Sequence, residues 1–517
     1  MHPDPESNNS LFHARKSWAI ASLTAVLLAG FEIFLACTNL GHYDDLYDAG
    51  NYLESARMMI RGGHLYSTIF DSQPPLWLPL VYGSLRLFGM NFLGGQMLIV
   101  ATGVLVVLMV GLVTRELSDW PGAWIAAAIV ILSPLELQWS RTVSPEVPAS
   151  AFAVAGMAFA MRYARSGARG PLLMASGLVA CSVLVKLLGL FTLPALVLAI
   201  AVRHWRVSRA APPIKLRPLT EDTLIVLGTF AAVIIIALAP FGPALVWKQA
   251  VEFHWAARSA IAADLMPQAT TVMRQFFAGD WLLTAASMFG VIGVLSAPEG
   301  IVIAGWIAFT IAGLFYHHPL FSHHMVVLIP PLAIAAGAGW SGFWRWLVRM
   351  MRSSQPAHNG IRSITAGLSI TAAISLGAGL STLAARQASA QMRSIQQVRP
   401  DDADLKAAQL IEQLTAADAS ILTDAQGIAF LAGRDVPPQL TDTSLVRIAS
   451  GYLTTAEVIG AAERSDVRLF LSWSGRLTLL PGVTQWAVRR FPFHVTMGKG
   501  RELYSMRPPS GSLPASD

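Results

Sequence analysis

The sequence is poor in charge and nearly lacks cysteine. Of its 517 residues, 13% are charged and 54% are hydrophobic, whereas about a quarter of a typical soluble domain is charged. The only cysteines are Cys37 and Cys181, which argues against a disulfide framework or a cysteine-based metal site. A soluble nucleotide-binding domain with a glycine-rich fingerprint is also missing. The composition therefore points away from soluble enzymes and towards the membrane.

Long apolar runs produce the mean hydropathy of +0.51. They approach or exceed the roughly 17–25 residues that cross a bilayer as a helix. We therefore predict a polytopic α-helical membrane protein with about 11 transmembrane helices. The predicted spans cover residues 18–38, 95–114, 121–139, 148–163, 171–186, 187–202, 222–240, 281–297, 300–316, 324–346 and 362–384.

The basic residues report topology rather than a nucleic-acid partner. The net charge is +6, but the basic residues gather in short loops at 13–16, 162–169, 203–217 and 345–362. These loops share one side if residues 75–90 dip into the membrane without crossing it, and Arg86 in the middle of that segment fits an interfacial helix. Basic loops mark the cytoplasm. The other loops are then on the outer face, and the first span is predicted to remain as a signal anchor.

The composition changes at about Gln387. Residues 401–415 predict an amphipathic helix, residues 419–423 and 467–473 predict strands, and Val436-Pro-Pro438 predicts a turn. The predicted domains are a membrane domain over residues 1–386 and a small soluble α/β domain outside the cytoplasm over residues 387–517, with a disordered tail from Pro508.

The first outer loop, residues 46–89, carries the clearest candidate for chemistry. Leu46, Ala49, Leu53, Ala56 and Ile60 recur at helical spacing, which predicts a helix lying on the membrane surface. Asp48 is on a different face of that helix, with Tyr52 one turn later. Asp48 is a candidate catalytic carboxylate, and the alternative is a solvated aspartate on an ordinary amphipathic helix.

Later outer loops add further ionisable residues. Glu146 begins a predicted span, where a helix N-terminus favours negative charge, so it is either a capping residue or a second acid. Arg141 is a candidate partner for Glu146 or for a substrate phosphate. Lys186 ends a predicted span, either as a snorkelling lysine or as a functional cation.

Histidines are concentrated in two outer loops. One loop carries His254, and residues 317–324 hold four histidines in eight residues. Without cysteine, and without a standard ligand spacing, hydrogen bonding to a lipid phosphate or to sugar hydroxyls is favoured over a zinc site. We expect no metal ligands and no cofactor, since nothing in the sequence indicates a divalent cation.

Taken together, these residues resemble GT-C glycosyltransferases, with the closest likeness to glycosyltransferase family 39 and its bacterial relatives. That group includes protein O-mannosyltransferases and the aminoarabinose transferase that modifies lipid A. The resemblance covers roughly residues 15–385. In the first outer loop it rests on Asp48 with Tyr52, Ala56-Arg57, Gly62-Gly63, Gln73-Pro-Pro75 and Leu87-Phe-Gly89.

The resemblance implies roles for several residues. Asp48 looks like the family's catalytic carboxylate, Glu146 like its second acid, and Lys186 like the lysine held near the donor phosphate. His324, followed by Pro330-Pro331, is similar to a later histidine-rich loop of the family. Ala49 and Glu146 depart from the family's usual glutamate and aspartate, and Asn51 and Gln73 depart from the arginine and lysine of the lipid A-modifying relatives. These departures weaken the link to lipid A and to an aminoarabinose donor. Asp44 and Asp45 stay open as alternatives to Asp48.

The resemblance implies a membrane glycosyltransferase that moves a sugar from a polyprenyl-phosphate donor to a glycan, lipid or protein acceptor. Transfer would be inverting, with an aspartate base, at the outer face of a bacterial cytoplasmic membrane. The implied substrate-binding residues are Tyr52, Arg57, Gln73, Arg141, Lys186, His254 and His324. The alternative is a transporter or flippase of a lipid-linked sugar. It predicts ionisable residues near the bilayer midplane, where only Glu32 is well inside a predicted span.

Overall fold

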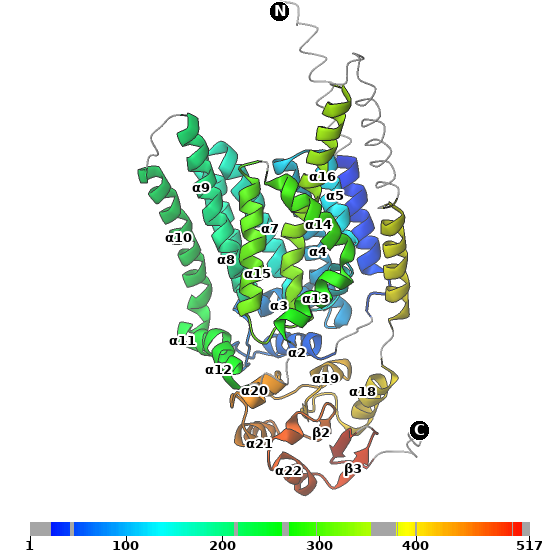
Figure 1. The fold of residues 1–517 in the computed structure, drawn as a ribbon. Helices are drawn as coiled ribbons and strands as arrows, with labels where there is room; N and C mark the ends of the chain where they lie inside the picture. Colours follow the sequence, from blue (N-terminus) through cyan, green and yellow to red (C-terminus); the bar gives the residue numbers. More distant parts are fainter. Residues whose placement is uncertain are drawn as a thin grey trace, which may run out of the picture.

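The computed structural model describes residues 22–41, 46–210, 216–260, 268–295, 297–352, 379, 381–398, 401–498 and 500–508. A bundle of helices forms one part of the molecule, and an α/β unit caps one end of it (Figure 1). The predicted mostly helical fold with several apolar helices is confirmed.

The bundle begins with an apolar helix over Ser22–Cys37. Short helices and single turns interrupt the long ones, mostly at the end that adjoins the α/β unit. The elements are α2 (Asp48–Ile60), α3 (Trp77–Phe88), α4 (Phe92–Leu117), α5 (Trp120–Ile131), α6 (Pro134–Trp139), α7 (Glu146–Ser166), α8 (Arg169–Val185), η1 (Leu187–Thr192), α9 (Leu193–Ala210), α10 (Leu216–Leu238), η2 (Ala239–Phe241), α11 (Pro243–Val246), the π-helical η3 (Trp247–Glu252), α12 (Phe253–Ala260), α13 (Ala269–Gly279), α14 (Trp281–Val294), α15 (Gly300–Tyr316), η5 (Ser322–Leu328) and α16 (Ile329–Arg352).

Within the described residues, five helical segments are long and apolar enough to cross a membrane, or six if α13 and α14, bent by 93°, form one broken span. Four shorter apolar helices, of 10–17 residues, accompany them. The predicted count of about 11 spans stays a prediction. Its last member, residues 362–384, is mostly outside the described residues.

Close helix packing holds the bundle together. α4 packs on α5, α7 and α16, and α14 packs along α16. Gly290 of α14 and Gly339 of α16 meet so tightly that a Cβ on Gly339 would be 2.3 Å from the Cα of Gly290. Small residues allow the two helix backbones to come this close. In lipid no hydrophobic effect drives helices together, so the van der Waals contacts of such close packing stabilise the pair.

Three predicted spans differ from the observed helices. The predicted span 121–139 is broken at Ser133, whose Oγ caps α6 by accepting the Glu136 N–H at 3.3 Å. The span predicted to begin at residue 324 starts as the 3₁₀ turn η5 before α16. The predicted helix at 187–202 also begins as a 3₁₀ turn, η1. Local capping chemistry explains the first break.

The segment predicted to dip into the membrane is the 12-residue helix α3. At about 1.5 Å per residue it is too short to cross a bilayer. The α2 stripe, however, is not on a membrane surface. Ala49, Leu53 and Ala56 are buried, because α2 packs on α3 on one side and on α19 of the C-terminal unit on the other.

The C-terminal unit is a four-stranded sheet with helices around it. It contains α18 (Asp402–Leu414), β1 (Ile421–Thr423), α19 (Gln426–Leu431), η6 (Pro438–Leu440), α20 (Leu445–Ala449), α21 (Thr455–Arg464), β2 (Leu469–Ser472), η7 (Leu477–Leu479), α22 (Val483–Arg490), β3 (Phe493–Thr496) and β4 (Glu502–Ser505). The strand order is β1-β2-β4-β3, with β1 parallel to β2 and the other pairs antiparallel. The sequence predicted α18, β1 and β2 but not the β3–β4 hairpin.

The predicted domain boundary between residues 386 and 387 falls inside a helix over residues 381–397. The predicted disordered tail is outside the described residues, apart from Pro508.

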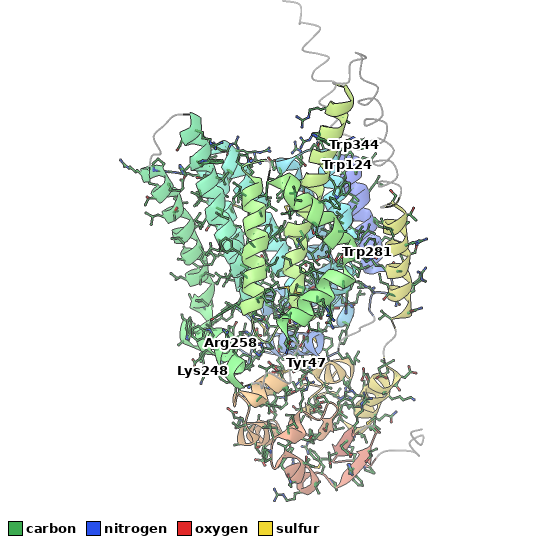
Figure 2. The ribbon with its side chains drawn as sticks, viewed as in Figure 1. Tyr47, Trp124, Lys248, Arg258, Trp281 and Trp344 are labelled. Carbon is green, nitrogen blue, oxygen red and sulfur yellow. The ribbon has the colours of Figure 1, made fainter. Side chains whose placement is uncertain are left out.

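The two ends of the bundle differ. Trp124 and Trp344 are at the end far from the C-terminal unit, whereas Tyr47 is at the junction with that unit (Figure 2). Around the α7–α8 connection, Arg165 pairs with Glu116 of α4, and Arg169 pairs with Glu221 of α10.

Candidate active site

Asp48 occupies the first position of α2, where the helix dipole favours a carboxylate. Tyr52, one turn later, rests edge-on against Trp77 of α3, with ring centroids 5.2 Å apart. Burial raises the pKa of the Tyr52 hydroxyl well above its usual range, and the nearby carboxylates of Asp48 and Glu146 raise it further. The first and second acids predicted from the sequence are therefore both close to Tyr52.

Glu146 begins α7 and is 1% exposed. Its Oε1 accepts a hydrogen bond from the Lys186 ammonium. Lys186 comes directly after α8 in extended conformation, which turns its side chain back towards α7. A buried carboxylate with an ammonium partner stays ionised, so Glu146 and Lys186 form a buried ion pair.

Four histidines surround Lys186. The His323 Nε2 is 3.6 Å from Glu146 Oε1, and the rings of His323 and His324 are 4.3 Å apart. Burial lowers the pKa of His317 to about 3, with Lys186, His254 and His323 adding to the effect. Burial likewise lowers the pKa of His254, whose Nε2 is 3.0 Å from the Ser72 carbonyl oxygen.

The neutral tautomer of His324 follows from its hydrogen bond. The Phe321 backbone N–H donates to His324 Nδ1 at 3.2 Å, so the ring hydrogen is on Nε2. His324 therefore offers a donor to a ligand near Lys186. We call Lys186 with His254, His317, His323 and His324 the cation side of the site.

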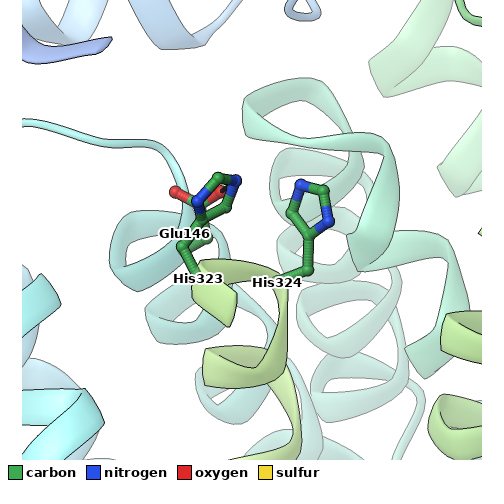
Figure 3. A group of neighbouring side chains, drawn as sticks. All are labelled: Glu146, His323 and His324. Atoms are coloured by element: carbon green, nitrogen blue, oxygen red, sulfur yellow. Dashed lines mark ion pairs between the residues drawn. The ribbon is translucent and has the colours of Figure 1, made fainter. Parts of the chain in front are cut away.

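The same histidines include the one candidate metal group in the described part of the chain. Glu146, His323 and His324 each offer a ligand atom, and these atoms are within 4.8 Å of one another (Figure 3). His324 uses its Nδ1 to accept the Phe321 N–H, and the Lys186 ammonium occupies Oε1 of Glu146. Oε2 of Glu146 has no partner among the described residues, so a cation competes with the Phe321 contact but does not require the Lys186 contact to break.

The Gln-Pro-Pro turn is tied to the cation side through the backbone. The Leu76 N–H donates to the Leu184 carbonyl at 2.9 Å, two residues before Lys186. Gln73 itself is a turn residue: its backbone N–H donates to Asp71 Oδ1 at 3.0 Å and its carbonyl accepts the Tyr66 hydroxyl at 2.6 Å. Its amide donates to Ser72 Oγ at 3.3 Å.

Two acids that the sequence reading did not single out join Asp48. Asp71 is buried, and burial, aided by the nearby carboxylate of Asp442, raises its pKa well above the usual range. Both carboxylates also raise the pKa of Tyr52. Asp48, Asp71 and Asp442 around Tyr52 form what we call the carboxylate side. Asp71 belongs to the first outer loop, but no local pattern brings Asp442 there.

Arg57 does not reach the cation side. It is 3% exposed and pairs with Glu54 at 3.2 Å and with Asp435 of the C-terminal unit at 3.3 Å. Its guanidinium also donates to the carbonyls of Phe430 and Arg434. The Val436 N–H donates to Glu54 at 3.2 Å. Arg57 thus docks the C-terminal unit rather than a donor phosphate.

The C-terminal unit packs closely against α2 and the rest of the first outer loop, and we call this interface the docking seam. A Cβ on Gly50 of α2 would be 2.3 Å from the Gly427 nitrogen of α19, so both positions require glycine. Two arginines of the C-terminal unit stack on rings of the first outer loop: Arg476 lies 3.4 Å from the Tyr47 ring centroid and Arg447 lies 3.9 Å from that of Phe70. The C-terminal unit therefore holds the helix that carries Asp48.

Arg141 also occupies a place other than the expected one. Its guanidinium donates to the Asn39 carbonyl at 3.2 Å, and its side chain lines a cavity beside α2. The partner of Glu146 is Lys186. Of the predicted site residues, the structure brings together Asp48, Tyr52, Glu146, Lys186, His254 and His324. Asp44 and Asp45 are outside the described residues.

Known proteins support the resemblance. A family model described as dolichyl-phosphate-mannose-protein mannosyltransferase matches residues 65–255. This stretch includes Glu146, Lys186 and His254, and it begins after Asp48. Among curated protein sequences, none matches the chain.

Solved structures match over most of the chain. ArnT from Cupriavidus metallidurans bound to undecaprenyl phosphate has a TM-score of 0.61 at 13% identity, covering 94% of this chain and 98% of that one. The oligosaccharyltransferase of Archaeoglobus fulgidus in the apo form has a TM-score of 0.56 at 13% identity, covering 87% and 69%. The same organism's AglB, in complex with an inhibitory peptide and a dolichol-phosphate, gives 0.53 at 14% identity, covering 89% and 69%.

These matches place the chain among GT-C folds. The predicted resemblance and the predicted enzyme class, a glycosyltransferase, are confirmed, and the chain has the GT-C fold with a mannosyltransferase-family segment over residues 65–255.

Proposed function

We propose that the protein transfers a sugar from a polyprenyl-phosphate carrier to an acceptor at the outer face of a bacterial cytoplasmic membrane. The observation that carries this proposal is the buried Glu146–Lys186 ion pair, with Tyr52 within electrostatic reach of both Glu146 and Asp48. A carboxylate beside a buried cation suits a reaction in which a hydroxyl loses a proton and a phosphate departs. Two similar structures contain undecaprenyl phosphate and dolichol-phosphate.

The reaction divides between the two sides. Asp48 takes the proton of the acceptor hydroxyl as its oxygen attacks the anomeric carbon. The bond from that carbon to the phosphate oxygen breaks, and the electron pair leaves with the lipid phosphate. Lys186 and the Nε2–H of His324 stabilise that phosphate. A single displacement inverts the anomeric centre.

Glu146 acts through Lys186 in this proposal. Its Oε1 fixes the ammonium, and both Glu146 and Asp48 act electrostatically on Tyr52. The proposal uses no metal ion and no cofactor. Transfer then depends on carboxylate, ammonium and imidazole groups that the chain itself provides.

The outer-face location rests on the distribution of charge. The basic loops, including those with Arg165, Arg169 and Arg345, belong to the bundle end away from the C-terminal unit, where Trp344 also lies (Figure 2). Basic loops favour the cytoplasm. The site adjoins the C-terminal unit at the opposite end, where nucleotide sugars are scarce and lipid-linked donors suit the chemistry.

The test follows transfer from a radiolabelled polyprenyl-phosphate sugar in liposomes made with membrane extract as the acceptor source. Asp48→Asn should abolish transfer while the variant still binds polyprenyl phosphate. Glu116→Gln, which alters a carboxylate at the far end of the bundle, serves as the matched control. Near wild-type transfer by Asp48→Asn would show that Asp48 is not the base.

One observation favours the alternative of a lipid-linked sugar transporter. Glu32, Glu136 and Asp280 are buried in the bundle and close enough to interact electrostatically, and the sequence had revealed only Glu32. Buried carboxylates within a membrane bundle are frequent in transport pathways. A flux assay in inside-out vesicles separates the two: labelled carrier that crosses the membrane unreacted supports the transporter.

A further inference from the structure

A groove runs along α6, next to the site. It consists of two adjoining cavities of about 460 and 200 Å³ that share Pro134, Gln138 and Gly279 as walls. Its first cavity has a mixed polar and apolar lining that includes the predicted site residue Arg141, and its second cavity has a mostly apolar lining. The first cavity reaches Ala49, which follows Asp48, and the second reaches Ser322, which precedes His323. Pockets of a few hundred Å³ are typical of small-molecule sites.

Amide side chains dominate the polar part of this groove. Five glutamines line it, Gln96, Gln138, Gln275, Gln387 and Gln391, together with the hydroxyl-bearing Thr142 and Ser394. Among the described lining residues, the charged ones are Arg141 in the first cavity and Asp280 in the second. An amide both donates and accepts hydrogen bonds, as a sugar hydroxyl does.

Two side chains in the walls are held by the α5–α6 turn. Gln391 is 6% exposed, and its amide nitrogen donates to the Leu132 carbonyl at 2.7 Å. Asp280 is 2% exposed, and its Oδ2 accepts a hydrogen bond from the Ser133 hydroxyl. The walls of both cavities are therefore fixed to the same turn.

The chemistry of the groove selects among ligands. An apolar prenyl chain would cover the exposed amides of Gln138 and Gln275 without giving them hydrogen-bond partners. A phosphate would meet one arginine at one end and the Asp280 carboxylate at the other. Sugar hydroxyls accept from amide nitrogens and donate to amide oxygens, without adding charge.

The groove is also in contact with the site. Trp139, at the end of α6, packs against His323 with ring centroids 5.0 Å apart. The groove thus adjoins His323 through Trp139, and its first cavity is lined by Ala49, the residue after Asp48.

We propose that this groove binds the neutral sugar hydroxyls of a carbohydrate acceptor, so that the protein extends a glycan or glycolipid rather than modifying a peptide. This proposal rests on the proposed function. Binding of free polyprenyl phosphate tests the proposed function, and binding of oligosaccharides tests the groove. Gln138 and Gln391 are the specificity residues.

The experiment measures binding to the purified full-length protein in a detergent without a sugar headgroup, since a maltoside would compete. The probes are neutral tetrasaccharides built of mannose, galactose or N-acetylglucosamine, a neutral tetrapeptide, and polyprenyl phosphate with and without its sugar. At least one tetrasaccharide should bind. Gln138→Leu and Gln391→Leu should each weaken that binding about fivefold, the size of one lost hydrogen bond. Gln413→Leu, which alters an exposed glutamine of α18, should not change it.

The remaining arms identify the source of the sugar. Polyprenyl phosphate should bind the Gln138→Leu and Gln391→Leu variants as it binds the wild type, and should be weakened by Lys186→Ala. If the glutamine variants weaken the sugar-loaded carrier relative to the free carrier, the groove holds the donor sugar and the acceptor proposal is overturned. It is also overturned if no tetrasaccharide binds, if the tetrapeptide binds instead, or if both glutamine variants bind sugar normally. If polyprenyl phosphate binds all of these variants, including Lys186→Ala, as it binds the wild type, the proposed function is contradicted. The tetrasaccharide result for the groove is not affected by that outcome.

Discussion

The carboxylate side and the cation side of the site are built from different parts of the chain. Asp48, Tyr52 and Asp71 belong to one continuous segment, which the C-terminal unit covers and to which it adds Asp442. The cation side collects Lys186 from the end of α8, His254 from α12 and three histidines from the α15–α16 connection. One side is a local structure under a cap, and the other is assembled wholly by tertiary packing.

The two sides also differ in how their charge is balanced. The Lys186 ammonium is matched by Glu146 and the nearby histidines are neutral, so the formal charges on this side cancel. On the other side Asp48, Asp71 and Asp442 all act on one tyrosine, and the pKa of Asp71 is raised by burial. Mutual repulsion of such carboxylates favours the uptake of a proton, which is what a base must do. In the proposed mechanism the carboxylate side therefore takes the proton, and the Lys186 ammonium meets the phosphate.

The largest effect is expected when a substitution removes the base of the carboxylate side and leaves the cation side intact. Asp48→Asn should lower the rate of sugar transfer about 10²- to 10⁴-fold, the usual contribution of a general base. Binding of polyprenyl phosphate should be unchanged. The measurement is transfer from labelled carrier, with binding followed in parallel and Glu116→Gln as the control. A parallel loss of carrier binding would mean that the two sides do not divide the reaction in this way.

The next effect breaks the cation side. Lys186→Ala should weaken binding of polyprenyl phosphate about 10- to 150-fold, the value of one hydrogen bond to a charged group. Removal of the lysine also leaves Glu146 as an uncompensated buried charge, so Lys186→Ala combined with Glu146→Gln should recover folding but not carrier binding. Lys248→Ala, which changes an exposed lysine of η3 (Figure 2), is the control. Unchanged carrier affinity in Lys186→Ala would remove Lys186 from the site.

The contrast between the two sides also explains what the sequence could predict. Asp48 and Tyr52 could be paired because helical spacing places them one turn apart, and Glu146 and Lys186 could be singled out because each stands at the end of an apolar span. The contact between Glu146 and Lys186 could not be predicted, since it depends on how α7 and α8 pack. Asp442 had no signal at all, because nothing local distinguishes it from other surface aspartates.

For Arg57 and the apolar stripe of α2, the sequence predicts the wrong surroundings. Because both belong to an outer loop, Arg57 is predicted to bind a donor phosphate and the stripe to lie on the membrane. The C-terminal unit occupies those surroundings instead, and its contacts with α2 come from residues nearly 400 positions away: Val436 bonds Glu54 across a separation of 382 residues. Helix periodicity identifies which face is apolar but not what covers it. β1 and β2 could be predicted because they are buried apolar runs, whereas the partly exposed β3 and the mostly buried β4 were both missed.

The third prediction separates the cap from the carboxylate side. Arg57→Met leaves Glu54 and Asp435 without their buried partner, and breaking a buried pair in this way costs about 3–5 kcal/mol. The apparent melting temperature should fall, and the C-terminal unit should become easier to cleave with protease. Arg468→Met, which removes an exposed pair with Asp466, should do neither. If Arg57→Met instead weakens carrier binding without a change in stability, Arg57 belongs to the donor site after all.

A smaller effect concerns pH at the same seam. Burial raises the pKa of Glu54 to about 7 from 4.5, a change that outweighs the opposing effect of Arg57. Between these two values the folded protein binds more protons than the unfolded chain, so stability falls as pH rises and levels off above about 7. The loss amounts to about 3 kcal/mol at most. Glu54→Gln lacks this dependence, so the melting temperature of the variant minus that of the wild type should increase from pH 5 to pH 8. A constant difference would show that Glu54 stays ionised beside Arg57.

The last prediction is that removal of metal ions has no effect on transfer. Glu146, His323 and His324 present three ligand atoms, and a divalent ion bound there would move Glu146 to a role unlike the one proposed. Because the Lys186 ammonium already holds the carboxylate, transfer should be the same after exhaustive treatment with EDTA as before it, and added Mn²⁺ or Zn²⁺ should not raise the rate. Lys186→Ala is the more sensitive variant for this test, because removal of the ammonium frees Glu146 to bind a metal ion. A metal requirement in the wild type would mean that the ion, rather than Lys186, receives the phosphate, and the cation side would then be a metal centre.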